Sequence, residues 1–162
     1  MKATAPAKEV LSVNATECTC TWRIPNFSKL KVDPWGDGKS SDIFSIGGHK
    51  WKLEVYPRGE GSAKDKFVSL YLWLVDDRDK LPKDWKVTVA STFSVICQHD
   101  PEKSLTMKET SKTWNFHSWL FWMGFCNLIP LTDFHDAANG FLVNDTVTFE
   151  AKIEVKKPAK TR

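Results

Sequence analysis

The sequence has little of what membrane and secreted proteins require. No apolar run in its 162 residues approaches the ~20 residues that span a bilayer, and residues 1–9 contain no apolar signal-peptide segment. Its 4 cysteines do not make a disulfide scaffold in a chain of this length. We therefore expect a cytoplasmic or nuclear protein that has no membrane partner.

An excess of positive charge is found only at the C-terminal end. The four basic residues of segment 156–162 (Lys156, Lys157, Lys160 and Arg162) outnumber the net charge of +3, so the remainder of the chain is close to neutral. A near-neutral body offers no basic stripe that a phosphate backbone could follow. We therefore expect no nucleic-acid partner, and we interpret residues 156–162 as a solvated basic tail.

Metal ligands and catalytic nucleophiles are scattered along the chain. The Cys-x-Cys pair at 18–20 has no matching pair of ligands, and segment 76–79 lacks the glycine and glutamate of a calcium loop. Cys97 lies two residues from His99, but no protease signature surrounds it or Cys126. We therefore predict no metal, no cofactor and no enzymatic activity.

What the chain does contain is a series of short segments in which apolar and polar residues alternate. In 51–55 and 147–155, apolar side chains occupy every second position, the period of a half-buried strand. Segment 67–75 is apolar on both faces, typical of a central strand whose second face is covered or available for contact. Further strands are predicted at 20–24, 42–46, 85–97, 104–110 and 114–119, with one helical turn near residues 130–135.

Several motifs follow one another in a recognisable order. They read TWRIPNFS (21–28), FSIGGHKW (44–51) with YPRG (56–59), VSLYL (68–72), GF (124–125) before Leu131, and NGFLVNDT (139–146). Together they resemble the MATH (meprin and TRAF homology) domain. They are similar to the motifs of plant MATH proteins, including the domains attached to some plant ubiquitin-specific proteases. The resemblance implies an all-β, antiparallel TRAF-like sandwich of about eight strands. It would span residues 17–155, after a flexible arm at 1–16.

The resemblance also implies a function. MATH domains are non-enzymatic and hold an extended peptide of a partner protein in a shallow aromatic groove, where strand-like docking supplies backbone hydrogen bonds. A protein partner with a short linear motif is therefore expected, together with recruitment to ubiquitin-related or signalling machinery. The positions that match the family's groove are Phe67, Trp114, Trp122, Met123, Gly124 and Phe125.

The sequence departs from the family pattern at this groove. Trp122 and Met123 stand where the family has an acid and a tryptophan, and Ser91 stands where peptide-binding members carry an aromatic residue. These changes favour a more apolar ligand. The alternative is a protein with an altered or lost groove that associates with itself or with other MATH proteins, or that acts as a decoy.

The chain has 8 tryptophans, which must be divided between core and surface. Alternation favours the core for Trp22, Phe44, Trp51 and Phe149. Large rings also gather in one segment that contains Trp114, Trp119, Trp122 and Phe125. We expect at least two of these four side chains to form an exposed apolar patch.

Overall fold

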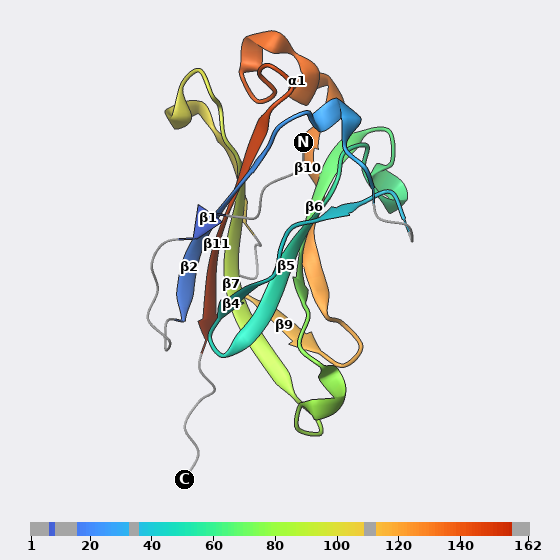
Figure 1. Ribbon diagram of the computed structural model, residues 1–162, viewed down its shortest axis with the longest axis vertical. Helices are drawn as coiled ribbons and strands as arrows, with labels where there is room; N and C mark the ends of the chain where they lie inside the picture. The colour runs from blue at the N-terminus through green and yellow to red at the C-terminus, as the bar shows by residue number, and fades with distance from the viewer. Residues whose placement is uncertain (1–6, 9–15, 33–35, 109–112, 157–162) are drawn as a thin grey trace.

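The computed structural model describes residues 7–8, 16–32, 36–108 and 113–156. These residues form a sandwich of two antiparallel β-sheets (Figure 1). The predicted all-β fold is therefore confirmed. No helix in the described ranges is long and apolar enough to cross a membrane.

The first sheet runs in the order β1-β2-β11-β7-β8. β9 also pairs with β7, next to the part of β7 that pairs with β8. Its strands are β1 (Ala7–Lys8), β2 (Glu17–Ile24), β7 (Lys86–Val95), β8 (Leu105–Lys108), β9 (Trp114–His117) and β11 (Val147–Lys156). β1 lies within the predicted arm, where it pairs with β2. The rest of that arm, apart from Thr16, lies outside the described residues, as do residues 109–110 of the predicted strand at 104–110 and residues 157–162 of the basic tail.

The second sheet runs in the order β10-β6-β5-β3, and β4 also pairs with β5. Its strands are β3 (Lys39–Ser40), β4 (Phe44–Ile46), β5 (His49–Tyr56), β6 (Phe67–Leu74) and β10 (Trp122–Pro130). Short helical turns connect the strands: η1 (Phe27–Lys29), η2 (Gly61–Ala63), η3 (Arg78–Lys80), η4 (Pro101–Lys103), α1 (Leu131–His135) and η5 (Ala137–Asn139). α1 is the helical turn that the sequence predicts.

The described strands number eleven, against the predicted figure of about eight. Two of them, β1 and β3, contain only two residues each, which is too short for alternation to be visible. β10 is a third strand that the sequence analysis does not predict.

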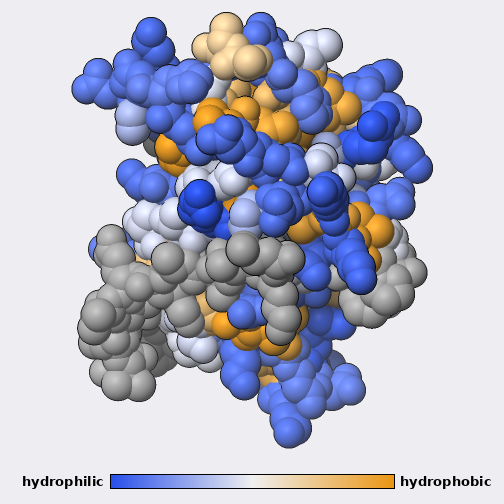
Figure 2. All heavy atoms as spheres, turned by 45° about the horizontal axis from the view of Figure 1, so that its top comes forward, coloured by the Kyte–Doolittle hydropathy of each residue, from blue (hydrophilic) through white to orange (hydrophobic). Residues whose placement is uncertain are grey.

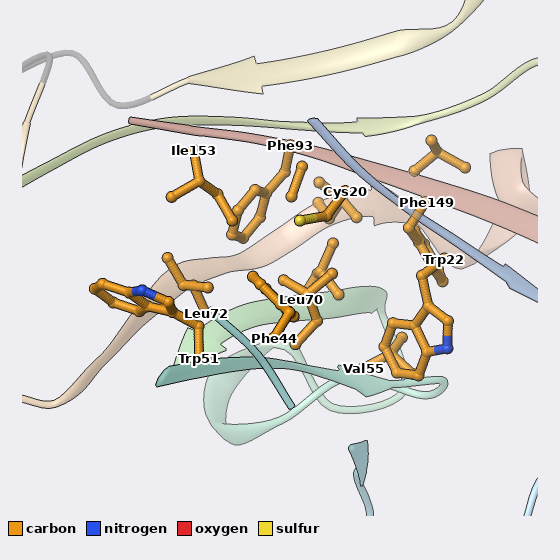
Figure 3. Packing of buried hydrophobic residues seen from close by; sticks show 14 of the residues in the cluster. Cys20, Trp22, Phe44, Trp51, Val55, Leu70, Leu72, Phe93, Phe149 and Ile153 are labelled. Atoms are coloured by element: carbon orange, nitrogen blue, oxygen red, sulfur yellow. The ribbon is translucent and has the colours of Figure 1, made fainter. Parts of the chain in front are cut away.

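The core lies between the two sheets, because the apolar faces of both point inward (Figure 3). Phe149 and Ile153 extend from the first sheet toward Leu70 and Leu72 of the second. The four aromatic residues predicted for the core are all buried: Trp22, Phe44, Trp51 and Phe149. Apolar burial of this kind contributes about 25 cal/mol per Å² and is the main force that holds the sheets together.

Two motifs that lie far apart in the sequence meet at one end of the sandwich. Asn144 and Asp145 have φ angles of 50° and 57° and form the tight turn before β11. The Asp145 carboxylate accepts hydrogen bonds from the backbone N–H of Ser28 (2.9 Å) and from its hydroxyl (2.6 Å). The Asp145 carbonyl accepts another from the N–H of Phe27 at 2.8 Å. The Asn-Phe-Ser and Asn-Asp-Thr motifs therefore depend on each other.

Replacing Asp145 tests this link. Asp145→Ala is expected to lower the free energy of unfolding by about 2 kcal/mol, because it removes two acceptors and puts alanine, which tolerates positive φ less well than aspartate, in the left-handed region. Asp145→Asn should lose less, since asparagine tolerates that φ and keeps one acceptor. Asp145→Gly separates the two causes, because it removes the acceptors while glycine adopts positive φ without strain. Urea unfolding measures all three variants, and an equal loss for Asn and Ala would contradict this account.

Candidate functional site

β10 forms one edge of the second sheet. It pairs with β6 along one side, and no other strand in the described part of the chain pairs with it. β9 precedes it in the first sheet, and the chain crosses between the sheets through a tight turn at residues 118–119. An edge strand presents a row of backbone N–H and C=O groups to which another extended chain can bond.

The strand predicted at 114–119 is shorter in the structure, because β9 ends at His117. The strand at 122–130 was missed because its alternation is interrupted: the β6–β10 register shifts between Phe125 and Ile129, which marks a bulge. Gly124 adds a second irregularity. A period of two cannot be recognised across these two features.

Two of the predicted groove residues contact each other between the sheets. Trp114 is only 3% exposed, and its ring centroid lies 5.7 Å from that of Phe125. Phe93 packs against both rings, at 5.6 Å and 5.8 Å. Met123 is opposite Leu72 and packs against the same core. Trp114 and Phe125 therefore help to hold the two sheets together along the β9–β10 side.

Trp122 lies on the other face of β10, on the outside of the second sheet. Its ring stacks on Trp73 with centroids 5.3 Å apart and an interplanar angle of 20°, and Phe121 packs edge-on at 5.0 Å. We call Trp73, Trp122 and Phe121 the outer stack. Trp122 is 37% exposed, while Trp119 in the preceding turn is 86% exposed. Two of the four clustered rings are thus exposed, and a shared apolar patch formed by them stays a prediction.

Gly124 follows on the same strand, opposite Tyr71. A β-carbon added there would lie 2.1 Å from the carbonyl oxygen of Leu70 and 2.7 Å from the Cα of Tyr71. Glycine is therefore needed for β10 to approach β6 this closely. Its lack of a side chain also leaves Tyr71 uncovered from the β10 side.

Phe67 is at the far end of this surface. It pairs with Pro130 at the start of β6, whereas Trp122 pairs with Trp73 near the end of β6. Phe67 and Trp73 are six residues apart on β6, which corresponds to about 20 Å along the strand. The structure thus places Trp114, Met123 and Phe125 toward the interior, Trp122 on the outer face, and Phe67 apart from both groups. A peptide contact for any of these residues remains a prediction.

Two residues of this surface are not among the positions that match the family's groove. Tyr71 and Trp73 lie between β5 and β10 on the outer face of the central strand β6. The sequence did indicate an apolar outer face at this strand, because segment 67–75 is apolar on both faces. Ser91, by contrast, faces the core opposite Ile153, and its hydroxyl has no hydrogen-bond partner among the described residues. It therefore lies away from this surface.

Two glutamates contact this outer surface. Tyr71 donates its hydroxyl hydrogen bond to Glu60 Oε2 at 2.7 Å, and the Trp73 indole N–H donates to Glu54 Oε1 at 3.1 Å. Glu54 is only 3% exposed. Burial raises the pKa of Tyr71 well above its ordinary value, and the hydrogen bond and charge of Glu60 raise it further. The Tyr71 phenol is therefore a neutral donor at physiological pH.

The described residues contain no group of three or more His, Cys, Asp or Glu side chains that could hold a metal ion. The thiol of the buried Cys97 donates to the carbonyl of Asn139 at 3.1 Å. The chemistry that this surface offers is backbone pairing at an edge, ring stacking and hydrogen bonding to carboxylates. These are means of recognition.

Comparison with known proteins supports the same interpretation. A family model described as the MATH domain matches residues 19–153. The chain is similar to Ubiquitin C-terminal hydrolase 12 of Arabidopsis thaliana, with 34% identity over 139 residues that cover 85% of this chain and 11% of the hydrolase. It is also similar to the Arabidopsis MATH domain and coiled-coil domain-containing protein At1g31390, with 36% identity over 138 residues that cover 83% of this chain and 46% of that protein.

The chain spans less than half the length of these two curated relatives. Among solved structures, it resembles Notothenia coriiceps TRAF5 with a TM-score of 0.57 and 25% identity, covering 89% of this chain and 75% of that one. The order of the motifs, the sandwich and the family match agree. The chain belongs to the MATH domain family, whose members are protein-interaction domains.

Proposed function

We propose that this chain binds an extended segment of a partner protein, which adds as a further strand along β10. The observation that carries the proposal is the position of β10, an edge strand that pairs with β6 alone among the described strands. Backbone hydrogen bonds to such an edge supply affinity for any extended peptide, and side-chain contacts select the sequence.

The outer stack gives this edge a place to select a side chain. A residue of the added strand directly opposite Trp122 would have its Cβ about 5 Å from that of Trp122. Trp73 and Phe121 already hold the Trp122 ring. A ring fixed in this way loses little rotamer freedom when a ligand packs on it, so more of the contact energy appears as affinity.

The proposed role is recruitment without chemistry on the ligand. Two relatives carry the names of ubiquitin C-terminal hydrolases. We therefore propose that the partner is brought to ubiquitin-related or signalling machinery, and that the residues of this chain perform no catalytic step. A short linear motif in the partner is the expected ligand.

Peptide selection followed by hydrogen exchange tests this function. Random dodecamers displayed on phage are selected against the immobilised chain, and the enriched peptide is then added during amide exchange. We expect slower exchange at alternate positions within residues 122–129, because the backbone N–H groups that point away from β6 gain partners. Residues 105–108 of β8, at the edge of the first sheet, serve as the internal control. Failure to enrich any peptide, or equal protection of both edges, would contradict strand addition at β10.

Self-association is the second candidate, because the same edge can pair with another copy and the exposed Trp119 ring lies next to it. Light scattering over the micromolar range decides this point. A stable dimer that dissociates when the enriched peptide is added would show that both partners use one edge. A monomer throughout that range would eliminate stable homo-oligomers.

A further inference from the structure

The two ends of the proposed binding surface carry different charge. At the Tyr71 end, Glu60 accepts a hydrogen bond from Tyr71, and Glu54, which lies opposite Tyr71 on β5, accepts one from Trp73 of the outer stack. Two of the three cations of the loop at 57–66 pair with other carboxylates: Arg58 with Asp65 at 3.0 Å, and Lys64 with Asp37 at 3.3 Å. Within the described ranges, neither glutamate forms an ion pair with a side chain of this protein. This end is therefore acidic.

The outer stack already has cations at both of its ends. Lys52 Nζ lies 5.4 Å from the centroid of the Trp73 ring, and the Arg78 guanidinium carbon lies 3.7 Å from the centroid of Phe121. A further cation beside Trp122 would be repelled by both. A neutral ring or a proline would add apolar contact to the stack without that repulsion.

Gly124 connects the two ends. It lies two residues beyond Trp122 on β10, so the two positions share a face, in register with Tyr71 and Trp73 respectively. A side chain of an added strand opposite Gly124 meets no β10 side chain there. It can extend over the Tyr71 ring toward the Glu60 carboxylate, whose hydrogen bond to Tyr71 fixes its position.

We infer that the partner segment carries a basic residue, arginine or lysine, opposite Gly124, and an uncharged aromatic residue or proline two positions away, opposite Trp122. This inference rests on the function proposed above and specifies its ligand. The basic group lies over Tyr71 and pairs with Glu60, while the neutral ring extends the outer stack. A basic side chain gains both a cation–π contact with Tyr71 and a charge-assisted hydrogen bond with Glu60.

Glu60→Gln tests the basic position, because glutamine keeps an acceptor for Tyr71 and removes only the charge. The enriched phage peptide is synthesised with a fluorescein label and titrated by fluorescence anisotropy. Its Kd should rise about three- to ten-fold for Glu60→Gln. Glu102→Gln is the matched control, since Glu102 is exposed in η4, at one end of the first sheet, and its Kd should stay within about two-fold of wild type.

A charge exchange makes the test specific. Changing the peptide's basic residue to glutamate should weaken binding to wild type, and Glu60→Lys should bind this altered peptide more tightly than the original one. In the double-mutant cycle, Glu60→Gln should cost nothing further once the basic residue is gone. The affinity of the wild type should also fall as NaCl is raised, and fall less for Glu60→Gln.

The outcomes separate the two proposals. Enriched peptides that protect β10 but show no basic residue two positions from a ring or proline overturn this inference and leave the proposed function intact. So does a Glu60→Gln variant that binds like Glu102→Gln. If no peptide is enriched, the proposed function fails, and this inference fails with it.

Discussion

Alanine at position 124 is expected to disrupt the edge of the second sheet. The new β-carbon would lie 2.1 Å from the Leu70 carbonyl oxygen, which is backbone and cannot move aside as a flexible side chain could. β10 must then separate from β6 in the middle of their pairing. We expect Gly124→Ala to lower the free energy of unfolding by about 3 kcal/mol, toward the upper end of overpacking costs. Peptide binding should be lost with it.

Urea unfolding measures the first effect and anisotropy titration the second. Gly36→Ala is the matched control, because a β-carbon there meets no atom of the described residues within 4 Å and its φ is not positive. It should leave the unfolding midpoint and peptide affinity unchanged. Equal stability for the two variants would mean that β10 does not need its close approach to β6.

Trp122→Ala is expected to have the largest effect on binding among substitutions that leave the fold intact. Aromatic anchors of this kind dominate peptide interfaces, so the Kd for the enriched peptide should rise about 30-fold or more. The fold should tolerate the change, because Trp122 is 37% exposed and contributes little to the core. Trp122→Phe, which keeps a ring on Trp73, should retain much of the affinity.

Trp119→Ala provides the control within the same hairpin. Trp119 is the more exposed ring at 86%, but the outer stack does not include it. Its removal should change the Kd less than about two-fold. If Trp119→Ala weakens binding as strongly as Trp122→Ala, exposed apolar area would account for the affinity. The geometry of the stack would then have no special role.

Much of the scaffold could be predicted because its signals are local. In β5 and β11 the polar and apolar residues alternate without interruption, and the residues predicted to face inward are buried. The turn residues of the Asn-Asp-Thr motif also act locally, through positive φ. Their contact with Ser28 could not be predicted, because 117 residues of sequence separate the two partners.

The candidate site was predicted less completely. Trp114, Trp122 and Phe125 lie within one aromatic segment, yet β9 and β10 belong to different sheets and the rings face different ways. The burial of Glu54 could not be predicted from the sequence either. Glu54 occupies an outward position in a regular alternation, but Trp73 and other surrounding residues of the same chain leave it only 3% exposed.

Sequence alone was enough to establish the fold class, the family and the inward faces of the regular strands. A period of two and a set of ordered motifs require only neighbouring residues. Tertiary contacts were needed to establish that β10 forms an edge among the described strands, which tryptophans lie on the outer face, and which carboxylates lie beside them. These features depend on strand register, on the β10 bulge and on close approach at Gly124, all of which arise only when distant segments pair.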